Sequence, residues 1–212
     1  MNAVARMTQL DLRTVRPYRT QVVILLILTP LLAALWRQPT VAPVMVMVMS
    51  VFVAAYPFAI AEKNDLDTLY GVLPIRRRAL VAGRYWFAMV LVVIAAVVGT
   101  LIGFAMGAAM GLPFGCVELG YLLVAAFVIV GVLVSVQFPL YFALGYTRAR
   151  LVTFLPIFAV MPVVILAMNV LPKDSITLPS PAVLVAIAVV GTVALLVASV
   201  AISARLDARR VR

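Results

Sequence analysis

The chain has 212 residues, of which 66% are hydrophobic and only 11% are charged. Soluble domains hold about 45–50% apolar and about 25% charged residues, so this composition predicts an integral membrane protein. There is no His and one Cys, Cys116, which excludes a His-bound metal, a paired-Cys zinc site, a Ser-His-Asp triad and an internal disulfide. The pattern GxxxxGK[ST] does not occur, so this chain has no P-loop for ATP.

The N-terminal segment, residues 1–20, has the pattern of an amphipathic helix lying on a membrane surface. On a helical wheel its Arg side chains share one side, whereas Asp11 falls among the apolar residues of the other. An apolar face opposite an Arg-rich face is typical of interfacial helices. The alternative is a disordered basic tail. The apolar side holds Ala3, Val4, Met7, Leu10, Val15 and Tyr18.

Six apolar runs predict an all-α, polytopic membrane protein with six transmembrane helices. The first run is short for a hydrocarbon layer of about 30 Å, and the third and fourth are long enough to tilt or protrude. Pro139 gives the fourth run a place to bend. A basic tail, residues 205–212, follows the last run. The runs lie at about 20–36, 41–61, 84–110, 118–146, 151–171 and 182–204.

The basic residues predict how these spans are oriented. If the N-terminus is cytoplasmic, fifteen of the 17 Lys and Arg residues fall on inner segments, and only Arg37 and Lys173 fall outside. Cytoplasmic loops of membrane proteins carry this excess, so both termini are expected in the cytoplasm of a cell (plasma or inner) membrane. The net charge of +10 then reflects topology and contact with anionic lipid rather than nucleic-acid binding. The inner loop 62–83 is the largest piece between spans.

The interiors of the predicted spans contain no ionisable residue. Such residues usually mark proton relays and ion pathways, so their absence disfavours a carrier powered by an ion gradient. The remaining polar candidates are Gln137 and Asn169. A buried amide needs partners, so Gln137 either makes a hydrogen bond between helices or lines a translocation pathway.

Glycine recurs at every fourth position of the third run, at Gly99, Gly103, Gly107 and Gly111. Small residues at this spacing form a smooth stripe on one helix face, which lets a second helix approach closely. The stripe predicts helix packing and does not say which helix docks on it.

The loop between the second and third spans combines acidic, apolar and basic residues. Glu62, Asp65 and Asp67 precede Leu69 and Tyr70. A loop that only holds topology needs the basic residues that follow but not exposed apolar ones. This mixture therefore favours a contact with a partner protein.

Residues further along the loop predict its local structure. Gly71 is expected to break a helix and Pro74 to begin another, and Arg76–Arg78 mark the cytoplasmic interface. Arg84, Tyr85 and Trp86 are expected to anchor the third span at the level of the lipid headgroups.

The same residues resemble the permease subunits of type-2 ABC transporters, above all the small six-span bacterial exporters. A Glu ends the second span, a short polar helix follows, and Leu-Pro-Ile and basic residues then lead into an Arg-Tyr pair. Gly71 departs from the pattern and leaves the end of the coupling segment open. The matching positions are Glu62, Lys63, Leu69, Leu73, Pro74, Ile75, Arg76, Arg77, Val81, Arg84 and Tyr85.

The resemblance implies a permease of an exporter for a peptide, an antimicrobial or another amphiphile. Such permeases work as pairs, identical or related, with separate ATPase subunits that bind ATP and Mg²⁺, so no cofactor and no catalytic residue is expected in this chain. A coupling helix in the 62–83 loop would dock on the ATPase. The alternative is a self-contained secondary carrier or channel. The residues implied in coupling are Glu62, Asp65, Asp67, Leu69, Tyr70 and Pro74.

Overall fold

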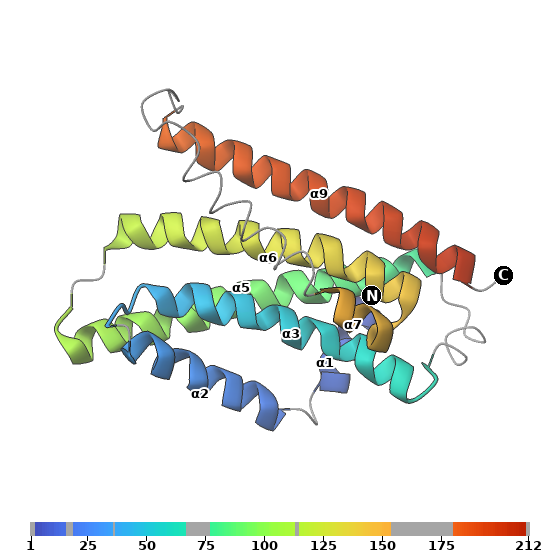
Figure 1. Cartoon of the computed structure of the whole chain (residues 1–212), viewed down its shortest axis with the longest axis horizontal. Coiled ribbons are helices and arrows are strands. Elements are labelled where there is room, and N and C mark those ends of the chain that lie inside the picture. The colour runs from blue at the N-terminus through green and yellow to red at the C-terminus, as the bar shows by residue number, and fades with distance from the viewer. Residues whose placement is uncertain are drawn as a thin grey trace.

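The structure, a computed structural model, describes residues 3–15, 19–35, 37–66, 77–112, 115–153 and 180–210. These segments form helices joined by short turns, with no strand among them (Figure 1). The all-helical prediction is therefore confirmed for the described part of the chain. The helices are α1 (Ala3–Val15), α2 (Arg19–Leu35), α3 (Val41–Lys63), α5 (Arg77–Met110), α6 (Cys116–Leu144), α7 (Tyr146–Thr153) and α9 (Pro181–Arg210).

The long helices lie side by side in one bundle. Helix α3 packs along α5, α6 packs along α9, and α3 also contacts α6, so that α3 and α6 join the two pairs. Helices α1 and α7 lie at the end of the bundle where α3 and α6 finish and α5 begins (Figure 1). We call this the basic end, because its exposed side chains include Arg13, Lys63, Arg78, Arg148 and Arg205.

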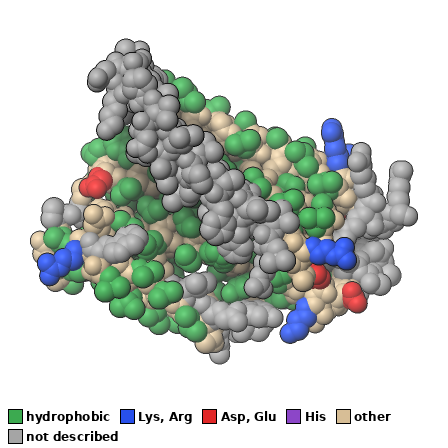
Figure 2. Space-filling model, viewed as in Figure 1, with side chains coloured by type: hydrophobic (Ala, Val, Ile, Leu, Met, Phe, Trp, Pro, Cys, Tyr) green, Lys and Arg blue, Asp and Glu red, His purple; other side chains and the backbone are tan. Residues whose placement is uncertain are grey.

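The surface between the two ends is apolar, as Figure 2 shows for the face in view. Large side chains such as Ile27, Val93 and Val190 are mostly exposed. A soluble protein rarely exposes apolar patches of this extent, so this surface faces lipid. Four helical segments are long and apolar enough to cross a membrane: Val41–Lys63, Arg78–Met110, Cys116–Leu144 and Ala182–Asp207.

These four segments correspond to the second, third, fourth and sixth predicted spans. Helix α2 has 17 residues, and its apolar part, Val22–Leu35, is shorter than the four long segments. Most of the predicted fifth span lies outside the described residues, so six spans stay a prediction. Helix α5 begins at Arg77, seven residues before the predicted start of the third span, because its first two turns continue the same helix beyond the apolar core.

Gly145 separates α6 from α7. Its φ of 82° lies in the left-handed region, which Gly enters without the steric penalty that other residues meet. Its N–H donates to the carbonyl of Tyr141, and its own carbonyl accepts from Ala149 in the next helix. The predicted fourth span, 118–146, therefore ends at Leu144, and α7 begins a new direction of the chain.

Glycines let the helices approach closely in the half of the bundle away from the basic end. Gly99, Gly103 and Gly107 are buried. A Cβ on Gly99 would lie 2.7 Å from Cα of Pro43, so α5 contacts the backbone of α3 there. Gly111 is exposed with a φ of 65° and follows the last residue of α5, where it ends the helix.

Candidate functional site at the basic end

Arg84 of α5 is the central side chain of the basic end. It is only 6% exposed, although it was expected at the level of the headgroups. Its guanidinium carbon lies 4.2 Å from the ring centre of Phe58 in α3 and 5.5 Å from that of Phe142 in α6. Aromatic faces attract a cation, and the attraction grows when water is excluded. The side chain of Arg84 therefore points to the rings of α3 and α6 inside the bundle, and its level relative to the headgroups stays a prediction.

The rings around Arg84 form one aromatic cluster. Phe58 lies 5.0 Å from Phe138, 5.1 Å from Tyr141 and 5.1 Å from Phe142, measured between ring centres. Two of the three pairs are edge-to-face, the arrangement that aromatic quadrupoles favour. We call Arg84 and these four rings the arginine–aromatic cluster. It joins the ends of α3 and α6 to the start of α5.

Helix α1 contacts the start of α5 through a buried face of Met7, Thr8 and Asp11. The hydroxyl of Thr8 donates to the carbonyl of Gly83 at 3.3 Å. Of the predicted apolar face, Met7 packs against the bundle, whereas Leu10 is 43% exposed and free to contact lipid. Asp11, which seemed to break the pattern, is the residue that faces the bundle.

Asp11 is 2% exposed and titrates abnormally. Burial raises the pKa of its carboxyl from 3.8 to about 6, and the positive charge of Arg84 partly opposes the rise. Oδ2 of Asp11 and Nε of Arg84 are both buried without a hydrogen-bond partner. The two side chains thus interact through their charges at a site from which water is excluded. This charge interaction connects α1 to the arginine–aromatic cluster.

Glu62, at the end of α3, contacts the start of α7. Its Oε2 accepts a hydrogen bond of 3.1 Å from the backbone N–H of Thr147. The first N–H groups of a helix have no partner inside the helix, and a negative charge is favourable beside them. Glu62 therefore fixes the last turn of α3 to α7. This interaction was not apparent from the sequence, because it joins residues 85 positions apart.

Tyr85, the neighbour of Arg84, links α5 to α9. It is buried, and its hydroxyl is within hydrogen-bond distance of Ser199 and, at 2.9 Å, of Ser203. Ser199 in turn donates to the carbonyl of Ser135 in α6 at 2.8 Å. Of the three residues expected at the headgroups, only Trp86 is exposed, at 59%.

The structure describes some of the remaining predicted site residues but not all of them. Asp65 is exposed, two residues beyond the end of α3, with a left-handed φ of 49°. Gln137 is 6% exposed on α6, next to Phe138 of the cluster. No group of three or more potential metal ligands occurs among the described residues. The candidates outside the described residues are Asp67, Leu69, Tyr70, Pro74 and Asn169.

The long apolar helices and the lipid-facing surface define a multi-pass membrane protein. The model of the ABC-2 family transporter proteins matches residues 8–206, which is almost the whole chain. The chain therefore belongs to this family of ABC transporter membrane proteins. No curated protein and no solved structure matches the chain significantly.

Proposed function

We propose that this chain is the permease subunit of an ABC exporter and that a separate ATPase subunit powers it from the basic end. Membership of the ABC-2 transporter family over residues 8–206 is the observation that carries the proposal. The chain contains no GxxxxGK[ST], so ATP and Mg²⁺ would be bound by the partner. A pair of permeases, identical or related, would form the pathway for a peptide, an antimicrobial or another amphiphile.

The contacts at the basic end support a coupling role for the segment that follows α3. Glu62 ties the last turn of α3 to α7, and the arginine–aromatic cluster ties the same part of α3 to α5 and α6. A push on residues 62–74 would therefore move the ends of four helices together. We expect Asp65, Asp67, Leu69, Tyr70 and Pro74 to make or support the contact with the ATPase.

Co-purification tests the partnership directly. The tagged chain, expressed with the ATPase encoded next to its gene, should retain that ATPase in detergent and, in proteoliposomes, export substrate only with ATP. Active transport by the chain alone, driven by an ion gradient, would contradict the proposal and favour a secondary carrier.

A double variant tests the coupling segment. Leu69→Ala with Tyr70→Ala should leave membrane insertion unchanged and separate ATP hydrolysis from transport, so that export falls while the ATPase still turns over. The matched control is Val117→Ala with Tyr121→Ala, a pair of exposed residues at the opposite end of the bundle. Normal export by the Leu69/Tyr70 variant would place the coupling contact elsewhere.

A further inference from the structure

Two adjoining hollows lie on the side of the bundle that α2 covers. The outer one, of about 510 Å³, lies between α1, α2 and α5, and the exposed Arg13 and Gln9 and the buried Phe87 line it. The inner one, of about 100 Å³, lies between α2, α3 and α5. Val22 and Leu91 line both, so the two hollows are neighbours along α2 and α5, and we call them together the groove.

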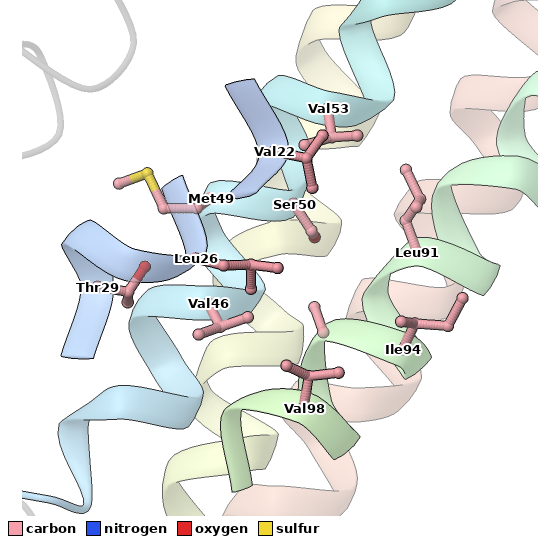
Figure 3. A pocket seen from close by; sticks show the side chains of 11 residues that line it. Val22, Leu26, Thr29, Val46, Met49, Ser50, Val53, Leu91, Ile94 and Val98 are labelled. Carbon is pink, nitrogen blue, oxygen red and sulfur yellow. The ribbon is translucent and has the colours of Figure 1, made fainter. Parts of the chain in front are cut away.

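The inner hollow is lined almost entirely by hydrocarbon. Leu26 of α2, Val53 of α3 and Ile94 of α5 surround it in Figure 3. Its polar side chains are Thr29 and Ser50. Ser50 donates to the carbonyl of Met47 at 2.6 Å, and Thr29 has a partner of its own. The lining therefore favours an apolar chain over a ligand that needs hydrogen bonds.

The shape of the groove fits a single acyl chain. The inner hollow is well below the 300–1,000 Å³ of drug-sized binding sites, so it excludes a bulky ring system. Along α5 the lining extends from Phe87 to Val98, a rise of about 16 Å, which is about half of a hydrocarbon layer of about 30 Å. The groove therefore has the depth of one leaflet.

The outer edge of the groove differs in chemistry from its inner end. The guanidinium of Arg13 and the amide of Gln9 are exposed there, and no acidic side chain is found among the described residues that line either hollow. Arg is suited to bind phosphate through paired hydrogen bonds. A cation beside a narrow hydrocarbon groove is complementary to a phospholipid with a negatively charged headgroup.

We propose that this groove binds one anionic phospholipid from the leaflet at the basic end, with its phosphate at Arg13 and one acyl chain between α2, α3 and α5. The lipid would fill the gap beside α2, which α3 and α5 contact only sparsely compared with one another. The groove does not include the coupling segment, so lipid binding can be present or absent whether or not an ATPase drives this chain.

Native mass spectrometry of the delipidated full-length protein tests the proposal, with phosphatidylglycerol and phosphatidylcholine as probes. The protein should retain one phosphatidylglycerol, bound about five-fold more tightly than phosphatidylcholine. Both lipids carry the phosphate, but the choline cation of phosphatidylcholine cancels its charge, and the attraction of a basic residue to net negative lipid contributes about a factor of this size. Arg13→Gln should reduce phosphatidylglycerol binding to the level of phosphatidylcholine. Arg205→Gln, at an exposed Arg of α9 outside the groove, is the matched control and should change nothing.

A second pair of variants tests the acyl chain. Val22→Trp blocks the junction of the two hollows and should abolish retention of either lipid, whereas Ile27→Trp, on the lipid-facing side of the same helix, should not. Equal affinity for both lipids in the parent, or an equal loss in Arg13→Gln and Arg205→Gln, would overturn the proposal. If Val22→Trp does not fold, the exposed Arg13→Gln variant still decides it.

Discussion

The two halves of the bundle are held together by different interactions. At the basic end, polar and charged side chains join helices that are distant in sequence, through Arg84 over Phe58, Glu62 to Thr147, and Tyr85 to α9. In the other half, α5 contacts the backbone of α3 at Gly99.

The two kinds of contact should respond differently to substitution and to pH. Contacts of glycine with backbone allow few alternative arrangements, because interiors are close-packed and a rotation would produce overlap. Interactions between charges and rings tolerate small changes of distance, and the interaction of a carboxylate with a cation can change with pH. The glycine contact should therefore be sensitive to added volume, and the basic end should be sensitive to removal of charge and to pH.

Removing the charge of Arg84 should have the largest effect. Arg84→Met deletes the cation over Phe58 and leaves the Asp11 carboxylate buried without a compensating charge. Loss of a desolvated cation–π interaction costs about 2 kcal/mol or more, and the uncompensated Asp11 adds to this cost. Thermal unfolding of the purified protein in detergent should show a large drop in Tm, and Arg78→Met, at an exposed Arg of the same helix, should change it little.

Combining Arg84→Met with Asp11→Asn then separates the loss of the cation over Phe58 from the loss of the charge that compensates Asp11. The double variant should recover part of the stability lost in Arg84→Met, because no buried carboxylate remains. Strictly additive effects would mean that Asp11 and Arg84 are not coupled, and α1 would then be held to α5 by Met7 and Thr8 alone.

A methyl group on the glycine face should have the next largest effect. Gly99→Ala places a Cβ 2.7 Å from Cα of Pro43, and backbone cannot rotate away as a side chain can. Overpacking of this kind costs about 1–3 kcal/mol. Gly191→Ala is the matched control, because nothing lies within 4 Å of its added Cβ and Ala favours a helix by about 1 kcal/mol. A Tm for Gly99→Ala at or above that of Gly191→Ala would contradict a close contact between Gly99 and the backbone of α3.

The pH dependence of α1 docking should give the smallest effect. Because the pKa of Asp11 is raised in the folded protein to about 6, its contribution to stability is complete below about pH 3.8 and is lost as the pH rises through about 6. Lowering the pH from 7 to 5 should thus stabilise the parent by about 1 kcal/mol relative to Asp11→Asn. Asp65→Asn, at an exposed carboxylate of the same end, should keep the behaviour of the parent. An identical pH profile in the parent and in Asp11→Asn would exclude a buried, titrating Asp11.

Much of the fold could be predicted from the sequence because hydropathy is a local property. Helices α3, α6 and α9 cover apolar runs that are visible without any tertiary information. The burial of Arg84 was not predicted, although the sequence carries a signal of it: Val81, Arg84 and Ala88 follow one another at helical spacing, and both apolar neighbours are buried. A charged residue near the end of a span can therefore face the bundle when its helical neighbours are apolar.

The sequence by itself determined that this is a helical membrane protein with its positive charge concentrated at one end, because lipid solvates apolar runs and excludes charge irrespective of how the helices pack. Only the tertiary structure decided which polar residues work together. Arg84 acts on Asp11 through its charge, and Glu62 and Tyr85 form hydrogen bonds to α7 and α9, all between residues far apart in the chain. Such contacts arise from the packing of helix against helix, which no local pattern of residues specifies.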